Sequence, residues 1–138
     1  MYLLQNQNEI SMKEYVLLFR MDITTPEVQP TPKQMESYMV DWMEWIDYIA
    51  EKGQLAEGGN HLSYAGRVIR HFDGITEEPY VAKKESVTGY ILIYAMDFDD
   101  AVHIAKKCPI LLGEGTSVEV RETATPWKIQ NTKRGDKL

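Results

Sequence analysis

Residues 88–109 read TGYILIYAMDFDDAVHIAKKCP and contain the clearest strand of the chain, followed directly by a helix. The strand, Thr88 to Ala95, is dense in Tyr and Ile, which favour extended backbone. The helix begins with acidic side chains at residues 97–100, where they suit its positive end, and Lys106 and Lys107 suit its negative end. Pro109 stops it, because proline has no amide hydrogen to donate. This stretch therefore predicts one complete β-α unit.

A second β-α unit is predicted near the start of the chain. Residues 14–20 alternate between two apolar sets, which is typical of a central strand covered on both faces. Thr31, Pro32 and Gln34 predict a helix start with a capping box. The helix should run to about Lys52, with one buried apolar stripe at residues 35, 38, 39, 42, 45, 46 and 49. Gly53 suits a left-handed C-terminal cap.

The remaining segments predict strands. Residues 55–62 contain Gly58 and Gly59 and favour a bulged strand. Residues 66–72 and 75–80 flank Asp73-Gly74, a pair that favours a type I′ hairpin turn. The last strand should cover residues 117–123. The order β-α-β, hairpin, β-α-β predicts a ferredoxin-like α+β fold, with two helices on one face of a mostly antiparallel sheet.

Two helices leave the opposite sheet face without a cover. The strands at residues 15–19 and 90–94 are apolar on both faces, so a monomer would expose an unusually large apolar patch. Burial against a second copy removes that patch. The pattern therefore predicts a homodimer.

Composition limits the class of protein. The chain has 138 residues, with 21 acidic against 15 basic side chains and a formal net charge of -6. A binder of phosphate backbones needs clustered Lys and Arg, and the only basic cluster, at residues 133–137, is short. We therefore expect no nucleic-acid partner. We expect one domain over residues 13–123, an N-terminal extension over 1–12 and a mostly polar tail over 124–138.

Other features bear on location and chemistry. Cys108 is the single cysteine, so no intrachain disulfide can form, which fits a cytoplasmic protein. The N-terminus does not have the pattern of a signal peptide, and no apolar run reaches the ~20 residues of a membrane span. Metal-ligand spacings and phosphate-binding glycine loops are also missing from the sequence, so we expect no metal and no cofactor.

Several short motifs together resemble the YCII-related (DGPF-type) domain family. They are KEYVLL at residues 13–18, GQL at 53–55, KE at 84–85, GY at 89–90 and CP at 108–109. The family signature Asp-Gly-Pro-Phe is replaced by EEPY at residues 77–80. The resemblance covers roughly residues 13–123 and implies a dimeric α/β-barrel.

The resemblance also shows where this chain departs from the family. Many members carry a histidine on the first helix, eleven positions before its terminal glycine, where it is proposed to work with a carboxylate as an acid/base pair. Here that position holds Trp42. The chemistry that the family implies is therefore not carried over to this chain.

Candidate site residues fall into two groups. Catalytic candidates are His61 and His71, because histidine is the usual acid or base near neutral pH, and Glu85 as a general base. A surface or loop histidine without a catalytic role is the alternative for His61 and His71. Candidate ligand-binding residues are Tyr38, Trp42 and Trp45 on the first helix, with Arg67 and Tyr80 on the hairpin. Plain core packing is the alternative for the helix aromatics, and a structural hydrogen bond or ion pair is the alternative for Glu85.

Three functions are compatible with this sequence. The first is binding of a small organic molecule in a cleft of the dimeric barrel. The second is an enzyme that uses acid/base chemistry on a small organic substrate, with His61 or His71 beside Glu85. The third is a regulatory or interaction module. The aromatic helix and the missing histidine favour the first.

Overall fold

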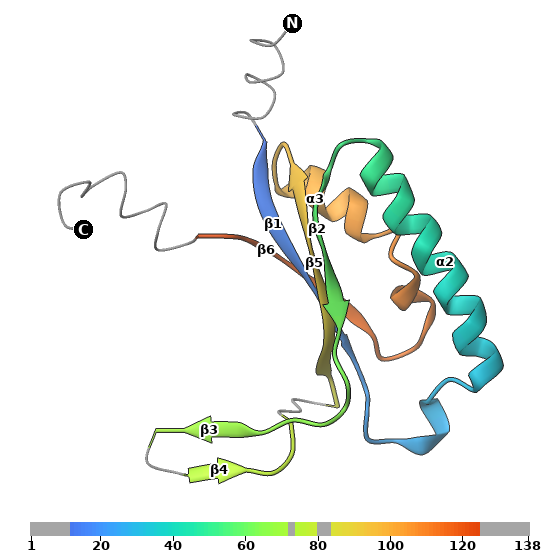
Figure 1. The fold of residues 1–138 in the computed structure, drawn as a ribbon, viewed down its shortest axis with the longest axis vertical. Coiled ribbons are helices and arrows are strands. Elements are labelled where there is room, and N and C mark those ends of the chain that lie inside the picture. The colour runs from blue at the N-terminus through green and yellow to red at the C-terminus, as the bar shows by residue number, and fades with distance from the viewer. Residues whose placement is uncertain (1–11, 72–73, 80–83, 125–138) are drawn as a thin grey trace, which may run out of the picture.

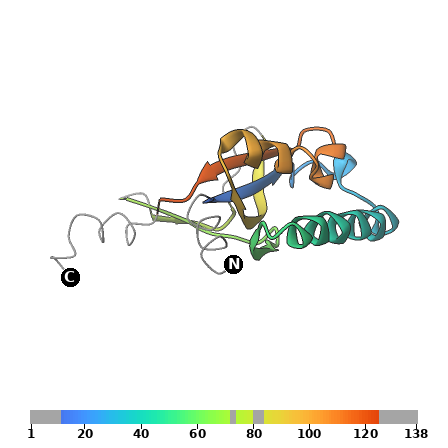
Figure 2. The same ribbon diagram turned by 90° about the horizontal axis from the view of Figure 1, so that it is seen from above.

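The computed structural model of the protein describes residues 12–71, 74–79 and 84–124, and it is drawn in Figure 1. Its four-stranded sheet has the order β2-β5-β1-β6, and each neighbouring pair is antiparallel. The strands are β1 (Lys13–Met21), β2 (Leu55–His61), β5 (Ser86–Ala95) and β6 (Ser117–Glu122). The helices α2 (Pro32–Glu51) and α3 (Phe98–Ala105) both cover the same face of the sheet (Figures 1 and 2).

This arrangement confirms the predicted α+β class with a mostly antiparallel sheet and two helices on one face. The strand order is compatible with the predicted ferredoxin-like topology. Short 3-10 helices, η1 (Pro26–Val28) and η2 (Pro109–Leu112), lie in the connections. Within the described ranges, neither α-helix is both long and apolar enough to cross a bilayer.

The core lies between the helices and the covered face of the sheet. Tyr15, Leu17 and Phe19 of β1 are at most 1% exposed, and they pack with alternate residues of β5. Burying each such side chain stabilises the fold by about 1.5–3 kcal/mol. The indole Nε1 of Trp45 on α2 donates to the backbone oxygen of Ile104 on α3 at 3.2 Å, which joins the two helices.

Local sequence signals set the helix ends as predicted. The Thr31 hydroxyl accepts from the Gln34 amide at 3.1 Å, and the Gln34 side chain accepts from the Thr31 amide at 2.8 Å. This capping box satisfies two amides that the helix leaves without partners. Gly53 follows α2 with a φ of 70°, a conformation that glycine adopts at little cost. Asp97 caps α3 by accepting from the Asp100 amide at 2.9 Å.

The single buried stripe predicted for the first helix is wrong in its first half. Trp45 and Ile49 are buried, but Met35 and Met39 are 44% and 40% exposed. The reason is geometric: the N-terminal half of α2 extends beyond the part of the sheet that packs against the helix and lies over a cleft instead.

The predicted hairpin forms a separate two-stranded arm of β3 (Val68–Arg70) and β4 (Gly74–Thr76). It projects from the sheet on the side away from the helices (Figures 1 and 2). Arg70 pairs with Gly74, so three residues connect the strands, and the predicted two-residue turn centred on Asp73-Gly74 is wrong. Gly74 is instead the first residue of β4, with a φ of 78°, a conformation that glycine adopts at little cost. Phe72, Asp73 and residues 80–83 lie outside the described residues.

Strand β2 is bulged, as its glycines predict. Leu55 pairs with Ile93 and His61 pairs with Gly89, so β2 uses two more residues than β5 over the same span. Gly59 has a φ of 62°, and a Cβ atom there would lie 2.6 Å from the carbonyl carbon of Tyr90. The strands therefore approach each other at a point where only glycine fits.

This close approach predicts a sharp difference between two neighbouring glycines. Gly59→Ala should lower the free energy of unfolding by roughly 2–4 kcal/mol, because the new methyl group overlaps the β5 backbone. Gly58→Ala should change it by less than about 0.5 kcal/mol, because nothing lies within 4 Å of that position. Urea denaturation of both variants measures the difference, and equal effects would contradict the bulge geometry.

Candidate functional site

A cleft of ≈ 490 Å³ opens between the N-terminal half of α2, the sheet and the loop that precedes the helix. Its walls are mainly apolar and aromatic, with a few polar side chains. The lining residues are Phe19, Met21, Asp22, Glu27, Val28, Gln29, Pro30, Gln34, Met35, Tyr38, Met39, Trp42, His61, Leu62, Tyr64, Thr88, Ile110, Gly113, Glu114 and Thr116. This volume and this mixture of surfaces are typical of small-molecule sites.

Trp42 forms the inner wall of the cleft. Its ring contacts Phe19 edge-on at 4.8 Å between centroids, and it contacts Trp45 at 5.5 Å. Both partners are buried, so the core holds the half-buried Trp42 ring in place from behind. The half-buried ring also lines the cleft. A fixed aromatic surface of this kind can stack on a flat ligand without losing much conformational entropy.

His61 lies beside Trp42, with 5.0 Å between their ring centroids. The bulges in β2 set this position, because they place His61 opposite Gly89. A Cβ atom on Gly89 would lie 2.9 Å from the Asn60 carbonyl oxygen and 3.4 Å from the Phe19 ring. Glycine at this point therefore lets the His61 end of β2 lie close to the inner wall of the cleft.

Hydrogen bonds hold the mouth of the cleft. The hydroxyl of Tyr64 donates to the Gln29 side-chain oxygen at 3.0 Å and joins the segment after β2 to the loop before α2. The Gln29 amide group donates to the backbone oxygens of Asp22 and Thr25 at 2.7 and 3.1 Å. Hydrogen bonds within the loop therefore hold its conformation, whereas the sequence predicts only a proline-rich connection there.

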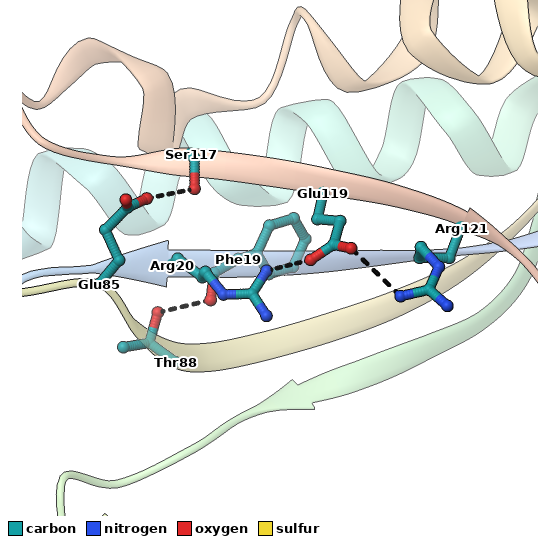
Figure 3. Close-up of polar contacts among 7 residues, drawn as sticks. All are labelled: Phe19, Arg20, Glu85, Thr88, Ser117, Glu119 and Arg121. Carbon is teal, nitrogen blue, oxygen red and sulfur yellow. Dashed lines mark hydrogen bonds and ion pairs between the residues drawn. The ribbon is translucent and has the colours of Figure 1, made fainter. Parts of the chain in front are cut away.

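Two hydroxyl groups, those of Thr88 and Thr116, also line the cleft. Thr88 is the extra residue of a bulge in β5, and its hydroxyl donates to the Phe19 backbone oxygen at 3.4 Å (Figure 3). The Thr116 hydroxyl donates to the backbone oxygens of Ile110 and Gly113, both at 2.8 Å. These bonds pair both hydroxyl hydrogens with backbone oxygens, and the imidazole of His61 lies beside Trp42.

The structure places some of the predicted ligand-binding residues in the cleft and others outside it. Tyr38 and Trp42 line the cleft, as the pocket hypothesis predicts. Trp45 lies in the core, bonds to α3 and does not line this cleft. Arg67 is exposed at the base of the arm, where its Nη1 donates to the backbone oxygen of Glu77 at 2.8 Å. Tyr80 lies outside the described residues.

The predicted catalytic residues do not meet in the cleft. His61 lines it, but His71 lies at the far end of β3 on the arm. Glu85 accepts a hydrogen bond from the Ser117 hydroxyl at 2.8 Å (Figure 3). That bond joins the start of β5 to the start of β6, so the Glu85 carboxylate makes a structural hydrogen bond. Across the part of the chain that the structure describes, no three His, Cys, Asp or Glu side chains are placed to share a metal ion.

A second hollow, of ≈ 580 Å³, lies between α2 and the segment at residues 106–112, and it is lined in part by Tyr48, Lys107 and Leu112. It is a wide surface depression. The Tyr48 hydroxyl accepts from Lys52 at 3.1 Å and from Lys107 at 3.3 Å, and these bonds lower the pKa of the phenol. All three side chains are exposed, so water competes for each of these interactions. The cleft beside Trp42 is the better enclosed site.

No protein-family model and no curated protein sequence matches this chain.

Cys108 offers a direct test of the core. Burial raises the pKa of its thiol to about 12, whereas a free cysteine titrates near about 8.5. The neutral thiol is a poor nucleophile, so the native protein should not react with Ellman's reagent within minutes at about pH 8. Unfolding in guanidinium should release one rapidly reacting thiol per chain, since the sequence has one cysteine. Rapid reaction of the native protein would contradict this packing.

Proposed function

We propose that this protein is a YCII-related, homodimeric α/β-barrel protein that binds a small organic molecule in the cleft beside Trp42. The observation that carries the proposal is the contact between Trp42 and His61, 5.0 Å apart in a cleft whose other walls are mainly apolar. An aromatic platform with one imidazole beside it can stack on a flat ligand and also orient it through a hydrogen bond.

Binding is favoured over catalysis by a His61–Glu85 acid/base pair because of the position of Glu85. A general acid/base pair must reach the same substrate atoms, within about 3 Å of each. Glu85 instead bonds to Ser117, and of these two residues only His61 lines the cleft. The chain also has Trp42 where the related family carries its histidine.

The dimer proposal rests on the sheet face opposite the helices, which we call the open face. Val16 pairs with Leu92 and Leu18 pairs with Tyr90, and residues directly opposite in antiparallel strands share a face. Because Tyr15, Leu17 and Phe19 point into the core, these four side chains point the other way. The open face is therefore apolar at its centre, as a protein interface commonly is.

The arm supports the same proposal. Ile69 and Ile75 are directly opposite each other on the arm and are 76% and 65% exposed. An isolated two-stranded ribbon is only marginally stable in water, so this apolar pair favours contact with another surface. The arm projects on the side of the open face (Figures 1 and 2), which is where a second copy would pack.

Three charged side chains of the open face are paired with one another (Figure 3). Arg20 Nη1 donates to Glu119, and Arg121 Nη1 donates to the other Glu119 oxygen at 3.2 Å. The hydrogen bond from Arg20, followed by that from Arg121, lowers the pKa of Glu119, so this carboxylate stays ionised at neutral pH. A paired carboxylate costs less to bury in an interface than an unpaired one.

Two histidine variants test the cleft. A thermal-shift screen of small aromatic and heteroaromatic compounds should find ligands that raise the melting temperature of the wild type. His61→Ala should weaken the best ligand by roughly 10-fold, because it removes the hydrogen bond and the ring beside Trp42. His71→Ala, the matched control on the arm, should leave binding unchanged. A wild type that no compound stabilises, or equal losses in both variants, would count against the proposal.

The dimer is tested by light scattering at micromolar concentration. The wild type should have the mass of two chains. Leu18→Asp should give the mass of one chain, because it places a charge at the centre of the open face. Leu112→Asp, an exposed leucine on η2, should remain dimeric and controls for surface charge. Ile69→Lys on the arm should weaken the dimer without altering the sheet, and a monomeric wild type would refute the proposal.

A further inference from the structure

We infer that the cleft selects a small organic cation, a flat apolar molecule that carries a positively charged nitrogen. The inference rests on the proposed function and specifies the ligand class for the same site. Two features of the cleft support this inference. Its charged side chains are all acidic, and its walls also present aromatic rings and methionine sulfur atoms.

The charged side chains of the cleft all have the same sign. Asp22 and Glu27 lie on the loop before α2, and Glu114 lies on the connection before β6. Among the described residues that line the cleft, no lysine or arginine balances them. An anionic ligand would therefore lose its hydration and be repelled by these carboxylates, with no lysine or arginine to pair with. A cationic ligand would be attracted by the same carboxylates.

Asp22 is held in its ionised form. Its Oδ1 accepts from the Thr24 amide and hydroxyl, both at 2.7 Å, and from the Thr25 amide at 3.1 Å. The bonds from the Thr25 and Thr24 side chains, followed by those from the backbone, lower the pKa of this carboxyl well below its usual range. These three bonds all use Oδ1. The loop therefore presents a fixed negative charge on the wall of the cleft.

The apolar surface of the cleft also suits a cation. The Trp42 ring is held by Phe19 and Trp45, and the negative face of an indole attracts a quaternary or protonated nitrogen. Met35 and Met39, which α2 leaves exposed, add polarisable sulfur to the same helix wall of the cleft as Trp42. Aromatic and thioether groups can be desolvated against a weakly hydrated organic cation at little cost, whereas a strongly hydrated metal ion gains nothing from them.

Three probes of similar size and different charge test the inference: benzyltrimethylammonium, benzyl alcohol and phenylacetate. Their affinities are measured by isothermal titration calorimetry on the full chain. Benzyltrimethylammonium should bind roughly 10-fold or more tightly than phenylacetate, with benzyl alcohol between them. The double variant Glu27→Gln/Glu114→Gln should weaken the cation several-fold and leave benzyl alcohol unchanged.

The control is Glu44→Gln/Glu51→Gln, which removes the same charge from exposed positions of α2 outside the cleft and should change no affinity. Trp42→Leu should weaken the cation and the alcohol together. Phenylacetate binding as tightly as the cation, or equal losses in the two double variants, would overturn this inference and leave the proposed function standing. If none of the three probes binds, both the inference and the proposed function fail.

Discussion

The β1–β5 ladder is the interaction on which the rest of the structure depends. Nine residue pairs join these two central strands, and the outer strands β2 and β6 each attach to one of them. One side of the ladder supplies most of the sheet's contribution to the core, and the other side forms the centre of the open face. At its Gly89 end the ladder leaves room for β2 to come close, which places His61 beside Trp42. The core, the open face and the cleft therefore all depend on the pairing of β1 with β5.

Much of the fold could be predicted because its signals are local. The capping box at Thr31, the glycine at position 53 and the alternation along β1 each depend on residues that are near one another in sequence. The cleft depends on contacts between distant segments. The exposure of Met35 and Met39 follows from how far α2 extends past the sheet, and the apolar stripe of a helix cannot reveal that distance. Tyr64 was missed for the same reason, since its partner Gln29 lies 35 positions away.

The residues that resemble a family signature have a structural role in this chain. A Cβ atom on Gly66 would lie 2.9 Å from the Cβ atom of Pro79, so the two ends of the arm meet at its base. Arg67 reinforces this contact by donating to the Glu77 backbone. The stretch at residues 77–79 therefore closes the arm and does not line the cleft.

The segment at residues 62–67 connects the cleft to the arm. It begins at the mouth of the cleft, where Tyr64 bonds to Gln29, and ends at the base of the arm, where Arg67 bonds to Glu77. A second copy that held the arm would thereby also hold one side of the mouth. Ligand affinity and self-association would then be thermodynamically linked, each strengthening the other by the same factor. The occupancy of the cleft would in that case depend on the concentration of the protein as well as on that of its ligand.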